Sequence, residues 1–151
     1  MRRAGAFTLV EIMIVVSIIA LLVAMALPSF LRSREKAQNA KLINGLRVAT
    51  DAFQMYAAEH NAYPADVNRG TVPPGMALYF GPTFDFTKNT PIGGNWDWDC
   101  QQFGFNAGVS VVGSGVSDAR MREVDAKIDD GDLSTGGFQN TASDRFTSII
   151  E

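Results

Sequence analysis

One carboxylate interrupts the long apolar segment near the start of this sequence. Residues 7–30 read FTLVEIMIVVSIIALLVAMALPSF, and Glu11 is the only charged residue among them. A carboxylate in hydrocarbon costs roughly 2.5–3.5 kcal/mol on insertion scales, so it normally has a partner and a function. The chemistry open to Glu11 is pairing with a cation, either within its own helix or on a neighbouring helix of an apolar bundle.

A second group of acidic side chains lies near the other end of the sequence, in the stretch DDGDLSTGG. Asp129, Asp130 and Asp132 supply hard oxygen ligands of the kind that Ca²⁺ prefers. The same stretch also fits the end of a helix, with Gly131 in the left-handed conformation. Because no twelve-residue calcium-loop pattern with a closing glutamate is present, the sequence predicts no cofactor and leaves calcium as the alternative.

The remaining reactive side chains do not form a catalytic pattern. His60 and Cys100 are the only soft metal ligands, and they lie far apart in the sequence. No nucleophile–base pair, phosphate-binding loop or zinc spacing is present, so the sequence predicts a protein that is not an enzyme. A formal net charge of −3 with dispersed Lys and Arg also predicts that nucleic acid is not a partner.

The sequence predicts a long helix at the start of the chain, which would position Glu11. At about 1.5 Å per residue, a helix over residues 7–30 spans about 36 Å, enough to cross a hydrocarbon core of about 30 Å. The helical pattern continues to His60 because apolar residues recur at steps of three and four, and Pro28 predicts a kink. The second half, residues 31–63, is amphipathic, so we expect a folded domain to pack on it.

The rest of the chain predicts a small sheet and a second helix. Residues 95–99 alternate polar and aromatic side chains, which is typical of a strand with one buried face. Trp96 and Trp98 are expected on that core face, and Asp97 and Asp99 would then be solvated. The other expected elements are a strand over residues 103–112, a helix over 117–130 and a strand over 145–150. The predicted fold class is α+β, with the long N-terminal helix packed against a small antiparallel sheet and a second short helix.

Two stretches of the sequence resemble the type IV pilins and type II secretion pseudopilins. The first is the basic leader MRRAGA followed by FTLVEIMIVV, and the second is YAAEHNAYPAD at the end of the long helix. The resemblance implies that a prepilin peptidase cuts between Ala6 and Phe7 and that Phe7 is then N-methylated. It also implies that Glu11 pairs with the new ammonium group of a neighbouring subunit during assembly. The family usually has glycine directly before the cut, whereas this chain has Gly5 one position earlier.

The resemblance implies a structural role for the whole chain. The implied segments are a prepilin leader peptide, a transmembrane and polymerisation helix, the amphipathic half of that helix and a periplasmic α+β head, over residues 1–6, 7–30, 31–63 and 64–151. The implied function is a structural subunit of a type IV pilus-like filament, most closely that of a type II secretion pseudopilin. The implied partners are copies of itself, the prepilin peptidase, an inner-membrane platform protein, minor pilins or pseudopilins, and the membrane. The implied location is the inner membrane, with the N-terminus cytoplasmic and the head periplasmic, and then a periplasmic or extracellular filament.

Other interpretations of the apolar segment stay open. Within the family, the alternative is a surface type IV pilin that serves adhesion or motility, although a lone Cys100 excludes an intrachain disulfide and favours the pseudopilin. The small-x-small stretch at residues 24–26 offers an ordinary signal peptidase site, which would release a soluble periplasmic binding module. A plain single-pass anchor is a further alternative, but it gives no reason for a glutamate at position 11.

Overall fold

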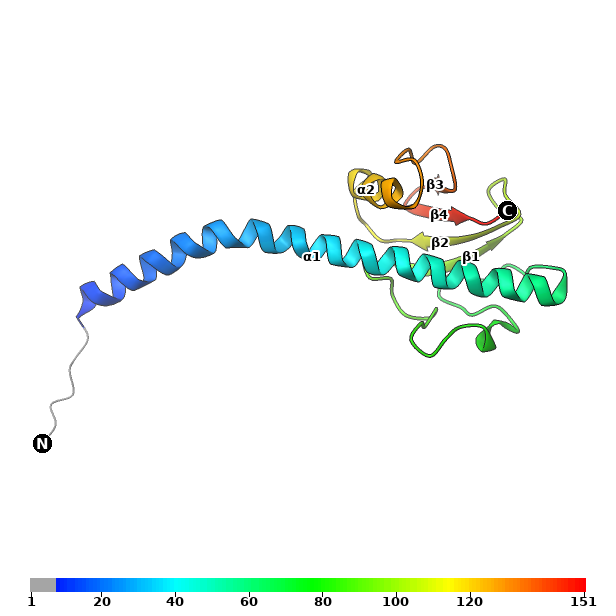
Figure 1. The fold of residues 1–151 in the computed structure, drawn as a ribbon, viewed down its shortest axis with the longest axis horizontal. Coiled ribbons are helices and arrows are strands. Elements are labelled where there is room, and N and C mark those ends of the chain that lie inside the picture. The colour runs from blue at the N-terminus through cyan, green and yellow to red at the C-terminus, as the bar shows by residue number, and fades with distance from the viewer. Residues whose placement is uncertain (1–7) are drawn as a thin grey trace, which may run out of the picture. The chain divides into compact units, whose positions relative to one another are not determined.

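The computed structural model describes residues 8–151 (Figure 1). The predicted leader and the predicted cleavage and methylation site, residues 5–7, lie outside the described residues. The chain forms two compact units, Met1–Ala37 and Gln38–Glu151, and each is described by itself. We refer to the unit Gln38–Glu151 as the head.

The first helix, α1, covers Leu9–His60, in agreement with the span that the sequence predicts. It ends where Asn61 adopts a positive φ of 53°, a common way to terminate a helix. Tyr63 follows closely and precedes Pro64, which disfavours a helical conformation at Tyr63. Pro28 lies inside the helix, and the kink expected there stays a prediction.

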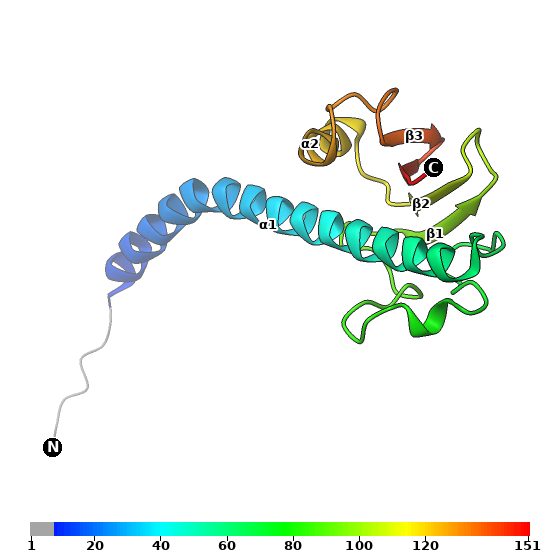
Figure 2. The same cartoon turned by 45° about the vertical axis from the view of Figure 1, so that its right-hand side comes forward.

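The head contains one antiparallel sheet of four strands in the order β1-β2-β4-β3. The strands are β1 (Asn95–Cys100), β2 (Ala107–Val112), β3 (Phe138–Ala142) and β4 (Arg145–Ile149). The other elements are the 3₁₀ turn Met76–Leu78 and the helix α2 (Asp118–Ile128). Both views place the sheet beside the part of α1 that belongs to the head (Figure 1, Figure 2). The predicted α+β fold class is confirmed.

Two strands differ from the sequence prediction. β2 begins at Ala107 instead of residue 103, because the turn before it places Gln101 and Phe103 at positive φ angles of 56° and 50°. The strand β3 was not expected at all, since its sequence FQNTA contains one large apolar residue and little alternation. It forms through antiparallel pairing with β4, which the residues of β3 alone do not signal.

The core of the head lies between one face of α1 and one face of the sheet. The buried face of α1 includes the predicted apolar positions Leu42, Leu46, Ala49 and Phe53. Trp98 of β1 stacks on Phe53 with 3.7 Å between the ring centroids, and its Nε1 donates to the Pro64 carbonyl oxygen at 3.0 Å. Trp96 is buried as well, so the expected placement of both tryptophans in the core is confirmed.

Trp96 packs directly against the backbone of α1 at Gly45. A Cβ at Gly45 would lie 2.8 Å from the Trp96 ring. Alanine is favoured over glycine inside a helix by about 1 kcal/mol. We nevertheless expect Gly45→Ala to destabilise the chain by about 1–3 kcal/mol, because the buried indole would have to move.

Thermal melting of the full chain in detergent measures this effect. Gly81→Ala is the matched control, since a Cβ at Gly81 meets nothing within 4 Å. A melting temperature for Gly45→Ala equal to or above that of the unaltered chain would contradict the close packing.

Candidate functional site

The apolar part of α1 exposes its side chains to the surroundings. An 18-residue window of the helix has a mean hydropathy of 2.8, and 0% of that window is buried. Leu21 and Leu22, for example, are 64% and 61% exposed. Among the described residues, α1 is the one helix long and apolar enough to cross a membrane, by length and composition. A continuous apolar surface of this kind requires a covering of lipid or of other helices.

Glu11 caps the first turn of α1. Its Oε2 accepts hydrogen bonds from the backbone N–H and the hydroxyl of Thr8, both at 2.8 Å, and Thr8 Oγ1 accepts from the Glu11 N–H at 3.2 Å. This reciprocal arrangement is a capping box, and its Thr-x-x-Glu spacing is a sequence signal that the interpretation above missed. Within residues 8–151, Oε1 of Glu11 accepts no hydrogen bond, so that oxygen is open to a cation from another chain.

Three acidic side chains converge where α2 ends. One carboxylate oxygen from each of Asp125, Asp129 and Asp130 lies within 4.8 Å of the other two. Asp125 is fully buried, and neither of its carboxylate oxygens has a well-formed hydrogen bond within the described part of the chain. Burial, followed by the charges of Asp130 and Asp129, raises the pKa of Asp125, with a smaller opposing effect of the nearby Gly131 N–H. A buried, unpaired carboxylate beside two others fits the oxygen ligands of a divalent cation.

The third predicted calcium ligand, Asp132, is not part of this group. Its Oδ1 accepts hydrogen bonds from the N–H and the hydroxyl of Ser134, at 3.0 and 2.7 Å. The structure therefore brings two of the three predicted candidates together with Asp125, one helical turn before Asp129. The spacing of Asp125 and Asp129 is visible in the sequence, but the burial of Asp125 is not.

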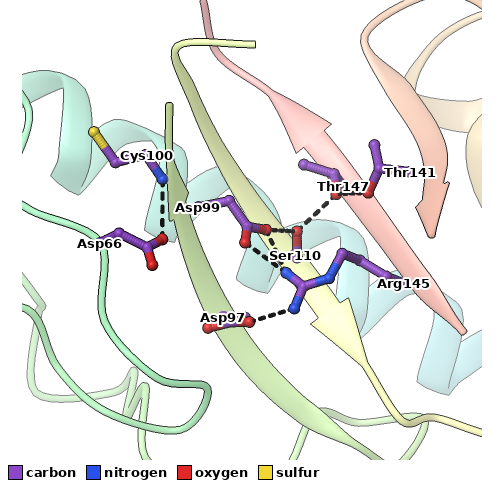
Figure 3. A network of polar contacts seen from close by, with 8 residues as sticks. All are labelled: Asp66, Asp97, Asp99, Cys100, Ser110, Thr141, Arg145 and Thr147. Atoms are coloured by element: carbon purple, nitrogen blue, oxygen red, sulfur yellow. Dashed lines mark hydrogen bonds and ion pairs between the residues drawn. The ribbon is translucent and has the colours of Figure 1, made fainter. Parts of the chain in front are cut away.

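Asp97 and Asp99 are buried, which corrects the expectation that they are solvated. Their exposed fractions are 5% and 3%. Both pair with Arg145 of β4 (Figure 3): Nη1 lies 2.6 Å from each Asp99 oxygen, and Nη2 lies 2.8 Å from Asp97 Oδ2. Alternation in a sequence shows which face of a strand is apolar, but it does not show whether the polar face is covered.

Hydroxyl groups extend this ion-pair network across the sheet (Figure 3). Thr141 and Thr147 lie 2.7 Å apart at their Oγ1 atoms, and Thr147 Oγ1 lies 2.7 Å from Ser110 Oγ. Ser110 in turn donates to Asp99. Because each hydroxyl carries one proton, the donors run in one direction, from Thr141 to Thr147 to Ser110 and then to the carboxylate.

Comparison with known proteins finds similarity to type II secretion core proteins and to type IV pilins. A family model described as the prokaryotic N-terminal methylation motif matches residues 1–27. Core protein G of the type II secretion system from Aeromonas hydrophila is 32% identical over 85 residues, covering 52% of this chain and 59% of that protein. Its counterpart from Klebsiella pneumoniae is 32% identical over 96 residues, covering 62% of this chain and 64% of that protein.

The same likeness extends to pilins. The type IV wide pilus major component PilA4 of Thermus thermophilus is 36% identical over 66 residues, covering 44% of this chain and 50% of that protein. The solved structure of the major type IV pilin PilA1 from Clostridium difficile matches with a TM-score of 0.54 at 13% identity, over 77% of this chain and 96% of that one. The chain is therefore similar to type II secretion core proteins and to type IV pilins. It shares the pilin fold, with a long N-terminal helix and a small antiparallel sheet, and it spans 59% and 64% of the first two relatives' length.

The likeness to the N-terminal methylation motif links the exposed apolar part of α1 with Glu11. The residues that match the methylation motif, 1–27, include Glu11 and the start of α1. Within the head, the buried apolar residues of α1 begin at Leu42.

Proposed function

We propose that this chain is a structural subunit of a pilus-like filament and serves as a type II secretion pseudopilin. The observation that carries the proposal is the fully exposed apolar window of α1 with one carboxylate, Glu11, in its first turn. An exposed apolar helix that carries one charge is best covered by copies of itself that supply the opposite charge, because the charge would otherwise be unpaired in an apolar bundle. The likeness to core protein G over up to 96 residues supports the secretion role. The proposal assigns no catalytic activity to the chain.

A surface type IV pilin is the second candidate. It is supported by the likeness to PilA4, although that match covers a smaller share of the chain than those to core protein G. The place of the filament discriminates between the two candidates. A pseudopilin forms a filament in the periplasm that supports protein secretion, whereas a pilin forms filaments on the cell surface.

The proposed partners and location follow from the same role. The chain would insert in the inner membrane with its N-terminus in the cytoplasm and its head in the periplasm. A prepilin peptidase would remove residues 1–6, and an inner-membrane platform protein would pass the processed subunit to a filament of identical copies. Minor pilins or pseudopilins would complete the filament. The apolar window of α1 supports the membrane location, because it is long enough to span the hydrocarbon core.

Filaments sheared from cells that produce this chain test the proposal. We expect them to contain a processed form that begins with N-methylated Phe7, because the small residues before Phe7 fit a peptidase that cuts there. Intact-mass and N-terminal peptide analysis identify the first residue. A mature soluble chain that begins at Leu27, as an ordinary signal peptidase would leave it, would contradict the proposal.

We also propose that the head binds calcium through Asp125, Asp129 and Asp130. The support is the buried Asp125 carboxylate, which lacks a hydrogen-bond partner among the described residues and lies beside two further carboxylates. A bound Ca²⁺ would offset two of the three negative charges and hold the end of α2 against the loop that follows it. Asp129 already accepts a hydrogen bond from the Gly137 N–H in that loop.

Melting the full chain in detergent, with calcium or with chelator, tests the calcium site. Calcium at 100 times its dissociation constant would stabilise the fold by about 2.7 kcal/mol, which raises the melting temperature by roughly 5–10 °C for a chain of this size. Asp125→Asn should remove the response and, in chelator, raise the melting temperature, because it neutralises a buried charge. Asp132→Asn is the control and should respond as the unaltered chain does. Equal melting temperatures in calcium and chelator would refute the site.

A further inference from the structure

A cavity of about 290 Å³ opens on the side of β1 that faces away from the tryptophans. Its lining comes from the loop after α1, from β1, from the turn before β2 and from β4. The lining side chains that matter for its chemistry are Asp66, Arg69, Asp97, Asp99, Phe103 and Arg145. The assembly role proposed above does not use this cavity.

One wall of the cavity carries an unsatisfied buried carboxylate oxygen. Asp97 is 5% exposed, and its Oδ2 accepts from Arg145 at 2.8 Å. Its Oδ1 is buried and has no hydrogen-bond partner in residues 8–151. Figure 3 shows that this oxygen points away from Arg145. Both oxygens of Asp99, in contrast, are bonded to Arg145, and one also accepts from Ser110, so the unsatisfied position is specific to Asp97.

The charges around the cavity favour a cationic ligand. Three acidic and two basic side chains line it, and the Arg145 charge is already shared between Asp97 and Asp99. Asp66 lies on the same side of the network and accepts one hydrogen bond, from the Cys100 N–H at 3.2 Å (Figure 3). A buried carboxylate oxygen without a donor is costly, and a cation that donates hydrogen bonds removes that cost.

The aromatic wall selects the kind of cation. The Arg145 guanidinium lies 4.8 Å from the centre of the Phe103 ring, and Phe103 remains 50% exposed. Phe103 is held at a positive φ of 50°, an unusual conformation for a bulky residue that tends to occur at binding sites. A planar guanidinium can stack on an aromatic ring while it donates to carboxylates, which an ammonium group does less well. A metal ion fits less well, because Asp66, Asp97 and Asp99 do not form a group with oxygens all within 4.8 Å, unlike Asp125, Asp129 and Asp130.

We propose that this cavity binds an arginine side chain of a neighbouring copy of the same chain. The inference rests on the proposed filament, in which copies lie side by side. The chain offers the complementary charge, since several exposed arginines make no ion pair among the described residues: Arg32, Arg34, Arg47 and Arg122. Arg69 lines the cavity itself but also makes no ion pair there.

The affinity of the cavity can be measured on the full chain in detergent micelles by amide NMR. Arginine methyl ester should shift the amide signals of Asp97 and Phe103 in a saturable way, and the neutral citrulline methyl ester should not. Asp97→Asn should weaken the binding at least tenfold, while Asp51→Asn, an exposed acid on α1, should leave it unchanged. Phe103→Leu should also weaken it and serves as the test if Asp97→Asn does not fold. No saturable shift, or an equal response to citrulline, would mean that the cavity holds only water and would overturn the proposal.

Two further measurements examine the occupant. Binding that appears only after Arg69→Gln would show that the chain's own Arg69 fills the cavity, which would also overturn the proposal. A photo-reactive residue placed at Gln102 should cross-link, in assembled filaments, to a peptide of a second copy that contains an arginine. Filaments that form normally but cross-link elsewhere or not at all would refute this inference and leave the filament role intact.

Discussion

Glu11→Ala is expected to abolish incorporation of the chain into filaments while leaving membrane insertion and processing intact. In the described structure, Glu11 uses one carboxylate oxygen to cap its own helix and leaves the other open. If that open oxygen pairs with the terminal ammonium of a neighbouring subunit, its loss leaves an unpaired charge in an apolar bundle, and the bundle does not form. Removing the carboxylate makes the segment more apolar, so insertion should be unaffected or improved. Immunoblots of sheared filaments against total membranes measure the ratio of assembled to inserted chain.

Two control variants separate pairing from capping in this experiment. Thr8→Ala removes the capping hydroxyl but keeps the Glu11 charge, so we expect it to retain some assembly. Glu35→Ala removes an exposed acid elsewhere on α1 and should assemble as the unaltered chain does. Normal amounts of sheared filaments from Glu11→Ala would contradict the pairing role.

Arg145→Met is expected to have the largest effect on the stability of the head. Methionine has an unbranched side chain that can replace the aliphatic part of the arginine. The substitution removes the guanidinium, which leaves the buried carboxylates of Asp97 and Asp99 without their cation. Breaking a buried ion pair by removing one partner typically costs about 3–5 kcal/mol. Denaturant unfolding of the full chain in detergent measures the loss, with Arg47→Met, an exposed arginine of α1, as the control.

The pH dependence of the Arg145→Met variant provides an independent check. Burial already raises the pKa of Asp97 above its ordinary value of 3.8, and Arg145 opposes that rise. Without Arg145, the pKa of Asp97 should rise further in the folded state. A carboxyl whose folded pKa is raised favours folding below its unfolded pKa and loses that contribution as the pH rises through the folded value. The stability gap to the unaltered chain should therefore narrow as the pH falls toward about 4. A gap that stays constant, or a loss below about 1 kcal/mol, would show that the ion pair is not needed for stability.

Replacement of the whole network gives a second comparison. In Arg145→Met combined with Asp97→Asn and Asp99→Asn, no buried charge is left unpaired. We expect this variant to regain part of the lost stability, because neutral groups in the same places avoid most of the desolvation cost. Recovery would assign the loss in Arg145→Met to the orphaned charges and not to the packing of the arginine side chain.

Features that depend on local sequence were determined by the residues alone. The span of α1, the apolar surface of its first part and the position of Glu11 follow from residue type and helical spacing. The two tryptophans of β1 reached the core for a similar reason, since alternation in a strand separates its two faces. Gly131 adopts the left-handed conformation that local preference predicts, with φ of 84°, although α2 ends earlier than expected, at Ile128.

Features that depend on which distant residues meet were decided only by the tertiary structure. Alternation placed Asp97 and Asp99 away from the apolar core, but their burial depends on Arg145, which approaches from β4, beyond the intervening β2. Asp125 is the one buried carboxylate of its cluster and lacks a hydrogen-bond partner among the described residues, because the head covers it. Its neighbours Asp129 and Asp130 remain exposed. Close contact of Gly45 with Trp96 likewise joins residues far apart in the chain. Hydrophobic periodicity records the average direction of side chains along one element, whereas burial of a charge and its partner depends on the packing of several elements together.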